Sequence, residues 1–352
     1  MTLSVRVAVI LLIIFTGTAG GQQPFAVAPT LRSVDVFGTE IFTADDVATE
    51  FKSDIASLAA SFSTWPPTAD AGGAATERIE TALKARGSFA YLRLGVTYSP
   101  APDNGLYVMV DVVEKKDTSR RMPFRKQPTG DLGDPEGLIA KWDEYQDKVF
   151  QLMFAGTPLQ VQDCPVLHCV APFSIPELAP YLRAFNDGAR AHEKELYEIV
   201  SRDKEPQHRA AALFLLAHTN NAKKLLPVLG DAIHDPDSGV RNNAMRIMME
   251  MAAFDRNREY PVKDLIAALE FPSAEDRNKS AYVLVSLVKS PRYRTAIDKE
   301  AVPSLLKLLR LRQANNHDPA YEILKELSGK TFGDRDYKDW ESWAAAHLKK
   351  GV

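Results

Sequence analysis

The stretch Asp235-Pro-Asp-Ser-Gly-Val-Arg-Asn-Asn-Ala244 decides the fold of the second half of this chain. It opens with two aspartates around a proline, and Arg241 is followed by small and apolar residues at helical spacing. Asp and Ser are favoured helix caps, and a proline is tolerated in the first turn of a helix. The pattern therefore predicts the start of a helix at this point.

Two other segments, Glu205–Ala212 and Ser273–Ala281, share this pattern. Their arginines, Arg209 and Arg277, lie 32 and 36 residues from Arg241. A period of this size is typical of solenoid repeats. A single helix pair cannot bury its apolar side alone, so such units stack on one another.

An apolar helical stretch precedes each of the three segments, which gives pairs of helices. We therefore expect an all-α solenoid of about four pairs over residues 190–350, by the stacking rule for repeats. The first helices are expected at residues 196–200, 225–233 and 262–269, and a fourth pair at 301–311 and 318–327.

The second half resembles HEAT repeats, in the form that carries D-P-D-x-x-V-R at the start of the second helix. Asp235, Pro236 and Arg241 match that motif, and Arg209 and Arg277 belong to partial copies. The resemblance implies an armadillo-type α-solenoid that binds other macromolecules and does no chemistry. We interpret the arginines as structural groups that pair with carboxylates or carbonyls of the adjacent repeat, with a catalytic role as the alternative.

The C-terminal segment carries two tryptophans, Trp340 and Trp343, on one helical face. It resembles the tail that follows many bacterial HEAT arrays. We interpret this segment as a cap that seals the end of the stack. A stacking site for a sugar or another ligand is the alternative.

The N-terminus has the pattern of an export signal, expected at residues 1–20. Arg6 is followed by the apolar run Val7–Phe15, and Gly17 and Ala19 suit a cleavage site. The run is about half of what a bilayer span needs, so a retained anchor or a buried helix is the less favoured alternative. We expect an exported protein, in the periplasm or cell envelope or secreted, with no transmembrane span after cleavage.

Residues 30–115 predict a small α+β domain with the order strand, helix, helix, strand, strand. The segment Thr43–Asp46 reads as a capping box, and Asp103-Asn-Gly105 is typical of a hairpin turn. The strands are expected at residues 31–36, 88–98 and 106–114, the helices from 43 and over 75–85, and a loop over 62–74.

This domain resembles the POTRA module of outer-membrane assembly and secretion proteins. The resemblance is carried by Val34-Asp-Val-Phe-Gly38, Ala85-Arg-Gly-Ser-Phe89 and the hairpin that ends at Val113-Glu114. Another small α+β sandwich is the alternative. A free sheet edge in such a module accepts a strand from a partner, unless the edge is covered by its own loops.

Two segments join the halves: a linker at residues 116–134 and a helical cap at 135–189. The linker is rich in Pro and Gly, so we expect a solvated connector, or a contact with anionic lipid or an acidic partner. The cap begins with an amphipathic helix over residues 136–154. The basic residues at the linker are Lys115, Lys116, Arg120, Arg121, Arg125 and Lys126.

The two cysteines of the chain, Cys164 and Cys169, lie five residues apart with a proline between them. Export would place them in an oxidising compartment, so we expect a disulfide. Two free structural thiols remain an alternative. A metal site with His168 lacks a fourth ligand, and a nucleophilic cysteine needs a base that the sequence does not place.

Composition and motifs point away from several functions. The net charge of −3 and the lack of a basic face argue against a nucleic-acid partner. No P-loop, G-x-G-x-x-G, G-x-S-x-G or H-E-x-x-H is present, so we expect no cofactor, no metal and no enzyme activity.

We therefore expect an exported, non-catalytic protein whose solenoid binds a protein partner, with possible peripheral contact with the envelope membrane. One alternative is an envelope assembly factor that acts through the POTRA-like domain. The other is an enzyme with its site at the Cys164–Cys169 loop.

Overall fold

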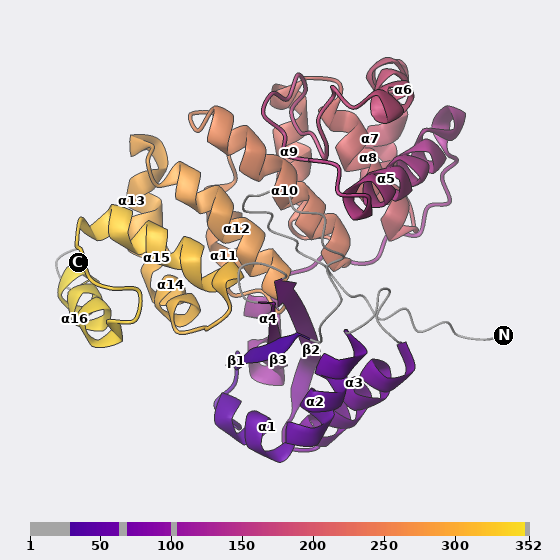
Figure 1. Cartoon of the computed structure of the whole chain (residues 1–352). Helices are drawn as coiled ribbons and strands as arrows, with labels where there is room; N and C mark the ends of the chain where they lie inside the picture. The colour runs from indigo at the N-terminus through magenta and orange to yellow at the C-terminus, as the bar shows by residue number, and fades with distance from the viewer. Residues whose placement is uncertain (1–28, 63–68, 100–103, 349–352) are drawn as a thin grey trace. The chain divides into compact units, whose positions relative to one another are not determined.

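The computed structural model describes residues 29–62, 69–99 and 104–348 (Figure 1). The predicted signal peptide at residues 1–20 lies outside these residues, as does Asp103 of the predicted hairpin turn. The chain forms two compact units. The first comprises the residues up to Met122 with Pro272–Ala274 and Leu309–His317, and the second comprises Pro123–Phe271, Glu275–Leu308 and Asp318–Val352.

A three-stranded sheet with helices packed against it forms most of the first unit (Figure 1). The strand order is β1-β3-β2, with β1 parallel and β2 antiparallel to β3. The strands are β1 (Thr30–Phe37), β2 (Phe89–Ser99) and β3 (Gly105–Glu114), and the helices are α1 (Ala44–Glu50), α2 (Lys52–Ser61) and α3 (Ala69–Lys84). The three strands follow the predicted order, but three helices stand where two were expected, because the first predicted helix is divided into α1 and α2 at Phe51.

The core of this unit follows the periods of its elements. Val108, Val110 and Val112 alternate along β3 and are buried in one cluster with the apolar stripe of the helices. Thr43 closes the predicted capping box, because its side chain accepts a hydrogen bond from Asp46 N–H and Asp46 accepts one from Thr43 N–H.

Helix α3 begins inside the segment that was expected to be a loop. The Gly-Gly pair suggested a loop, but Gly72 lies in a helix where α3 meets α2. A Cβ atom on Gly72 would lie 2.6 Å from the Ser61 side-chain oxygen, so glycine permits the close approach of the two helices.

The expected linker at 116–134 is not a solvated connector throughout. Arg121, in the short helix α4 (Thr118–Arg121), is 2% exposed and donates to the carbonyls of Gly38 and Val112. Gly38 has a φ of +96°, and a Cβ there would clash with the Arg121 guanidinium. The basic residues of this segment suggested contact with solvent. The Arg121 guanidinium is buried instead, because main-chain carbonyls accept its hydrogen bonds. A 3-10 turn, Lys115–Asp117, precedes α4.

In the second unit, residues after Pro123 run along the turns of the helix pairs. Arg125 N–H donates to the His234 carbonyl, and the Arg125 side chain donates to Val200 O and pairs with Asp235. Gly130 forms a parallel bridge with Asp203. Arg125 and Gly130 are therefore attached to the helix pairs, while Lys126, Gln127 and Asp131 are exposed.

Helices make up the rest of the second unit and confirm the predicted solenoid-like fold (Figure 1). Successive helices contact their neighbours in the array, as α7 does with α8 and α8 with α10. The cap helices are α5 (Leu138–Phe154) and α6 (Ala179–Ala191). The array comprises α7 (Glu193–Arg202), α8 (Pro206–Ala217), α9 (Ala222–Ala232), α10 (Ser238–Phe254), α11 (Val262–Ala268), α12 (Ala274–Leu287), α13 (Pro291–Glu300), α14 (Val302–Leu309), α15 (Ala314–Ser328) and α16 (Tyr337–Leu348). Two 3-10 turns, Pro135–Gly137 and Pro176–Leu178, precede α5 and α6.

Candidate functional site

The buried Arg209 guanidinium joins two adjacent helix pairs. Its Nε lies 2.9 Å from Asp235 Oδ2 and its Nη2 lies 2.6 Å from Asp235 Oδ1. Its Nη1 donates to the carbonyls of Asp203 and Lys204, in the turn that precedes α8. A bidentate pair of this kind fixes orientation as well as distance.

Arg241 repeats the arrangement one pair further along. Its Nε lies 2.9 Å from Asp276 Oδ2, and its Nη1 donates to the carbonyls of Asp235 and Pro236 in the turn before α10. Its guanidinium also lies 3.9 Å from the centre of the Phe124 ring. Arg277 Nη1 donates to the Phe271 carbonyl.

The three arginines therefore share one pattern, in which each binds the carbonyl of the residue six positions before it. All three side chains are buried, so they face the inside of the array rather than a substrate. This is the arrangement expected of groups that hold adjacent repeats together. The sequence did not reveal Asp276 as a partner, because its copy of the motif lacks the Asp-Pro-Asp start.

The two tryptophans of α16 have different environments. Trp340 is fully buried, donates from Nε1 to the Gly333 carbonyl, and meets Phe332 edge-on at 5.1 Å. Trp343 is half-buried and stacks on His347 at 5.0 Å. Trp340 thus lies in the packed end of the array and presents no open stacking surface.

Cys164 and Cys169 form a disulfide. The loop that it closes is attached to the array, because Leu167 N–H donates to the Ala217 carbonyl and Asn220 donates to the Pro165 carbonyl. With both sulfurs bonded, neither is a thiolate ligand or nucleophile. Within the described residues, no group of three or more His, Cys, Asp or Glu side chains is arranged to hold a metal.

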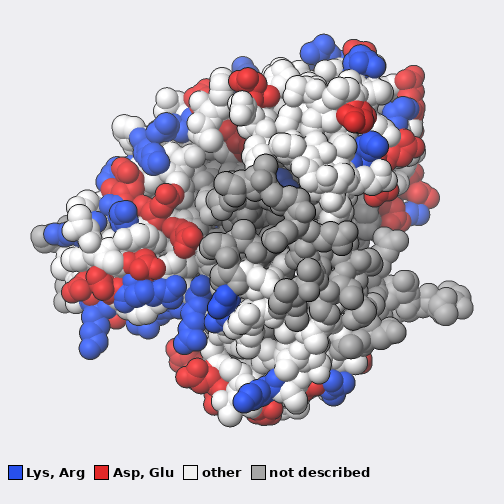
Figure 2. Space-filling model, viewed as in Figure 1, with Lys and Arg blue, Asp and Glu red and all other residues white. Residues whose placement is uncertain are grey.

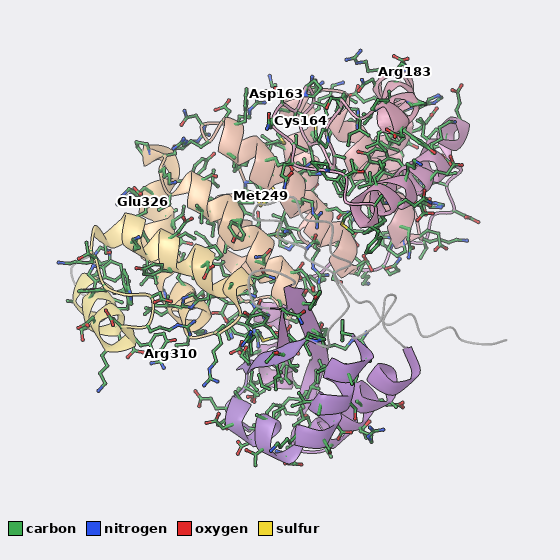
Figure 3. The ribbon with its side chains drawn as sticks, in the orientation of Figure 1. Asp163, Cys164, Arg183, Met249, Arg310 and Glu326 are labelled. Atoms are coloured by element: carbon green, nitrogen blue, oxygen red, sulfur yellow. A yellow bond between two sulfur atoms is a disulfide. The ribbon has the colours of Figure 1, made fainter. Side chains whose placement is uncertain are left out.

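The same loop contacts helix α10 through Glu250. The Cys169 N–H donates to Glu250 Oε2 at 3.2 Å, and His168 Nδ1 lies 2.8 Å from the same oxygen. Figure 3 labels Cys164 in this loop and Met249, the neighbour of Glu250, on α10. The loop and α10 are therefore joined at one carboxylate.

Behind the loop is a cavity of about 10 Å³, which is room for about one water molecule. His168 lines it and stacks on Phe214 at 4.9 Å. His218 also lines it, and burial, with a smaller contribution from His168, lowers the pKa of His218 to about 4. A cavity of this size excludes an organic substrate.

Glu250 belongs to a row of polar side chains on second helices. Asn242, Arg246 and Glu250 follow one another at four-residue steps on α10, so they share one face. Lys279 of α12 lies close enough to interact electrostatically with both Arg246 and Glu250. We call these four residues the polar row.

The pKa of Lys279 depends on the charged side chains around it. Burial lowers this pKa to about 7, and the Arg246 cation adds to the effect, while Glu275 and Glu250 oppose it. Sequence reasoning missed the row, because its residues read as the solvated side of amphipathic helices. The four-residue spacing on α10 is the signal that points to it.

Taken together, the stacked helix pairs and their buried arginines define the class of an α-solenoid. Residues 193–284, which span α7 to most of α12, match the family model of HEAT repeats. That match confirms the resemblance to HEAT repeats over residues 193–284. A comparison with curated proteins found no match.

HEAT repeats suggest a protein-interaction or scaffold role, and the family is generally non-catalytic. The resemblance of residues 30–115 to a POTRA domain is not confirmed. In that unit, Glu80 of α3 accepts a hydrogen bond from the Leu94 N–H of edge strand β2 at 3.0 Å. This part of the sheet edge is therefore occupied by the unit's own side chain, which protects it from strand addition.

Within the described residues, no helix combines the length and the apolar character that crossing a membrane requires.

Proposed function

We propose that this chain is a non-catalytic scaffold that binds a partner protein along the face of its second helices. The polar row is the observation that carries the proposal. It lies on α10 and α12, inside the segment that matches HEAT repeats. Charged side chains on a repeat array are suited to pair with complementary charges on a partner protein.

The buried arginines support the proposal because they make this face rigid. Arg209 and Arg241 join successive pairs through Asp235 and Asp276. A surface that is fixed before binding loses less conformational freedom on association. The array is therefore suited to present the polar row in one arrangement.

Surface charge gives no support to a nucleic-acid partner. Figure 2 shows acidic as well as basic side chains on the described residues of the face in view. A phosphate-binding surface would concentrate basic residues instead.

Site-specific photo-crosslinking in the intact chain tests the proposal. A crosslinking amino acid at Met249, beside Glu250 on α10, should capture a partner protein in the native host. The same amino acid at Lys263, an exposed position on the first helix α11, is the control and should capture none. The proposal fails if Met249 captures no protein or if both positions capture the same proteins equally.

We also propose that the chain works in an oxidising compartment, in the periplasm, the cell envelope or outside the cell. The Cys164–Cys169 disulfide supports this placement. Differential alkylation of the natively expressed protein, read by mass spectrometry, should find both cysteines oxidised. Two reduced thiols in the native protein would contradict the placement.

A further inference from the structure

We infer that the Cys164–Cys169 disulfide is a redox switch that controls whether Glu250 is free to bind the partner. The inference rests on the proposed function and names a regulation of the same face. It follows from the unequal burial of the two cysteines and from the contacts that the closed loop makes with α10.

The two bonded cysteines differ in their access to solvent. Cys164, labelled in Figure 3, is exposed, whereas Cys169 is 5% exposed. A thiolate attacks a disulfide at a sulfur that it can reach, and the other sulfur leaves. An external reductant therefore attacks Cys164, and Cys169 is the leaving group.

The reductant that this chemistry requires is a dithiol, such as the thiol pair of a protein oxidoreductase. Its first thiolate forms a bond to the Cys164 sulfur, the Cys164–Cys169 bond breaks, and Cys169 leaves as a thiolate that takes a proton from water. The second thiol then attacks the mixed disulfide, forms the reductant's own disulfide and releases Cys164. The chain is reduced and the dithiol is oxidised.

The middle of the loop is held to the array without the disulfide. Asn220 donates to the Pro165 carbonyl at 2.9 Å, and the Leu167 N–H donates to the Ala217 carbonyl at 3.2 Å. Reduction leaves these two hydrogen bonds in place. It frees instead the end of the loop at Cys169, which the disulfide fixes in the oxidised chain.

The end that reduction frees is the part of the loop that occupies Glu250. The Cys169 N–H donates to Glu250 Oε2 at 3.2 Å, and His168 Nδ1 lies 2.8 Å from the same oxygen. The Glu250 side chain is 36% exposed, so a partner can reach it. In the oxidised chain the loop competes for this carboxylate, and in the reduced chain a basic group of the partner pairs with it.

The order of attack is tested by trapping the mixed disulfide in the intact chain. Brief treatment with glutathione, a monothiol, is followed by capping of the released thiol with N-ethylmaleimide. We expect fragment ions that place glutathione on Cys164 and the maleimide on Cys169. The reverse arrangement would overturn the order of attack.

Binding of the purified protein captured at Met249 tests the switch itself. The oxidised full chain is compared with the chain reduced by dithiothreitol and with the double variant Cys164→Ser, Cys169→Ser. We expect the last two to bind about threefold more tightly than the oxidised chain, which is the effect of one exposed ion pair. Equal or weaker binding after reduction would overturn the switch.

Glu250→Gln should remove the difference between the oxidised and the reduced chain, because an amide does not form an ion pair with a basic group of the partner. The matched control Glu300→Gln, at the exposed end of α13, should keep the difference. A difference that survives Glu250→Gln would contradict the role of this carboxylate.

Hydrogen exchange resolved to single amides separates local release from loss of the fold. Reduction should speed exchange at Cys169 and leave exchange at Leu167 unchanged, because the Leu167 N–H keeps its bond to the Ala217 carbonyl. Faster exchange at both amides would mean that the whole loop detaches, and would contradict the mechanism.

The switch and the proposed function fail in different ways. A partner captured at Met249 that binds the oxidised and the reduced chain equally would exclude the switch and leave the scaffold role intact. No capture at Met249 in either form would exclude the scaffold role and the regulation that rests on it.

Discussion

At the scale of single residues, the repeat arginines matter because each is a buried charge with a fixed partner. Arg209 and Asp235 are both fully buried and joined by two hydrogen bonds. Removing one member of such a pair leaves an uncompensated charge in the interior, which is worse than removing both. Buried pairs of this kind therefore affect stability in a non-additive way.

Arg209→Met should lower the free energy of unfolding by about 3–5 kcal/mol, the cost of leaving a buried charge unpaired. Asp235→Leu should cost a comparable amount, because Arg209 and Arg125 would both lose their carboxylate. The double variant should lose clearly less than the sum of the two. Urea unfolding of the four proteins measures the cycle, and additive losses would contradict the pairing.

His218 gives a prediction about pH. Its folded pKa of about 4 lies below the ordinary value of 6.5, so between these values the unfolded chain binds more protons. The stability that neutral His218 provides is present above pH 6.5 and is lost as the pH falls through 4. The shift corresponds to about 3 kcal/mol.

A matched variant isolates this effect from other titrating groups. Burial also raises the pKa of Asp276, to about 6, which changes stability in the opposite direction over a similar range. In His218→Asn the Asp276 contribution remains, so the difference in stability between wild type and variant reports on His218 alone. Urea unfolding should show this difference shrinking from pH 7 to pH 4, and a constant difference would refute the assignment.

At the scale of elements, the sequence predicted the helices and strands whose apolar residues are regularly spaced. The stripe of Val47, Phe51, Ile55 and Leu58 is buried as expected, although the helix is interrupted at Phe51. Helix α10 begins where the Asp-Pro-Asp motif places it, with Asp237 as its cap. Periodicity and caps are local properties, so one sequence is enough to read them.

Elements whose character depends on distant contacts were misread or missed. Helix α13 was not predicted, because only Tyr293 and Ile297 are buried along it. Helix α15 was expected to begin at Asp318, but it begins at Ala314 with Pro319 inside it. The polar row escaped prediction for the same reason, since Lys279 and Arg246 come together only in the folded array.

The disulfide loop is the element that links the helical cap to α10. Replacing both cysteines, in Cys164→Ser with Cys169→Ser, should lower the free energy of unfolding by about 2 kcal/mol, the entropy of closing so short a loop. Urea unfolding under non-reducing conditions measures it. The hydrogen bond from the backbone N–H of position 169 to Glu250 should loosen as well, seen as faster hydrogen exchange at that amide. Unchanged stability would show that the loop is held without the disulfide.

At the scale of the whole molecule, the chain combines a small α+β unit with a helical array, of which residues 193–284 match HEAT repeats. The class of fold was predictable from repeat spacing, while the recognition surface was not. Packing arginines and capping aspartates recur in the sequence, whereas a binding face consists of side chains that need not recur. The second helices are therefore the face that we expect to meet the partner.

Hydrogen–deuterium exchange of the intact chain, alone and in complex with the protein captured at Met249, tests that claim most directly. We predict slower exchange on binding in α10 and α12, with unchanged exchange in the first helices α9 and α11. Protection confined to α9 and α11, or to the sheet unit, would contradict it.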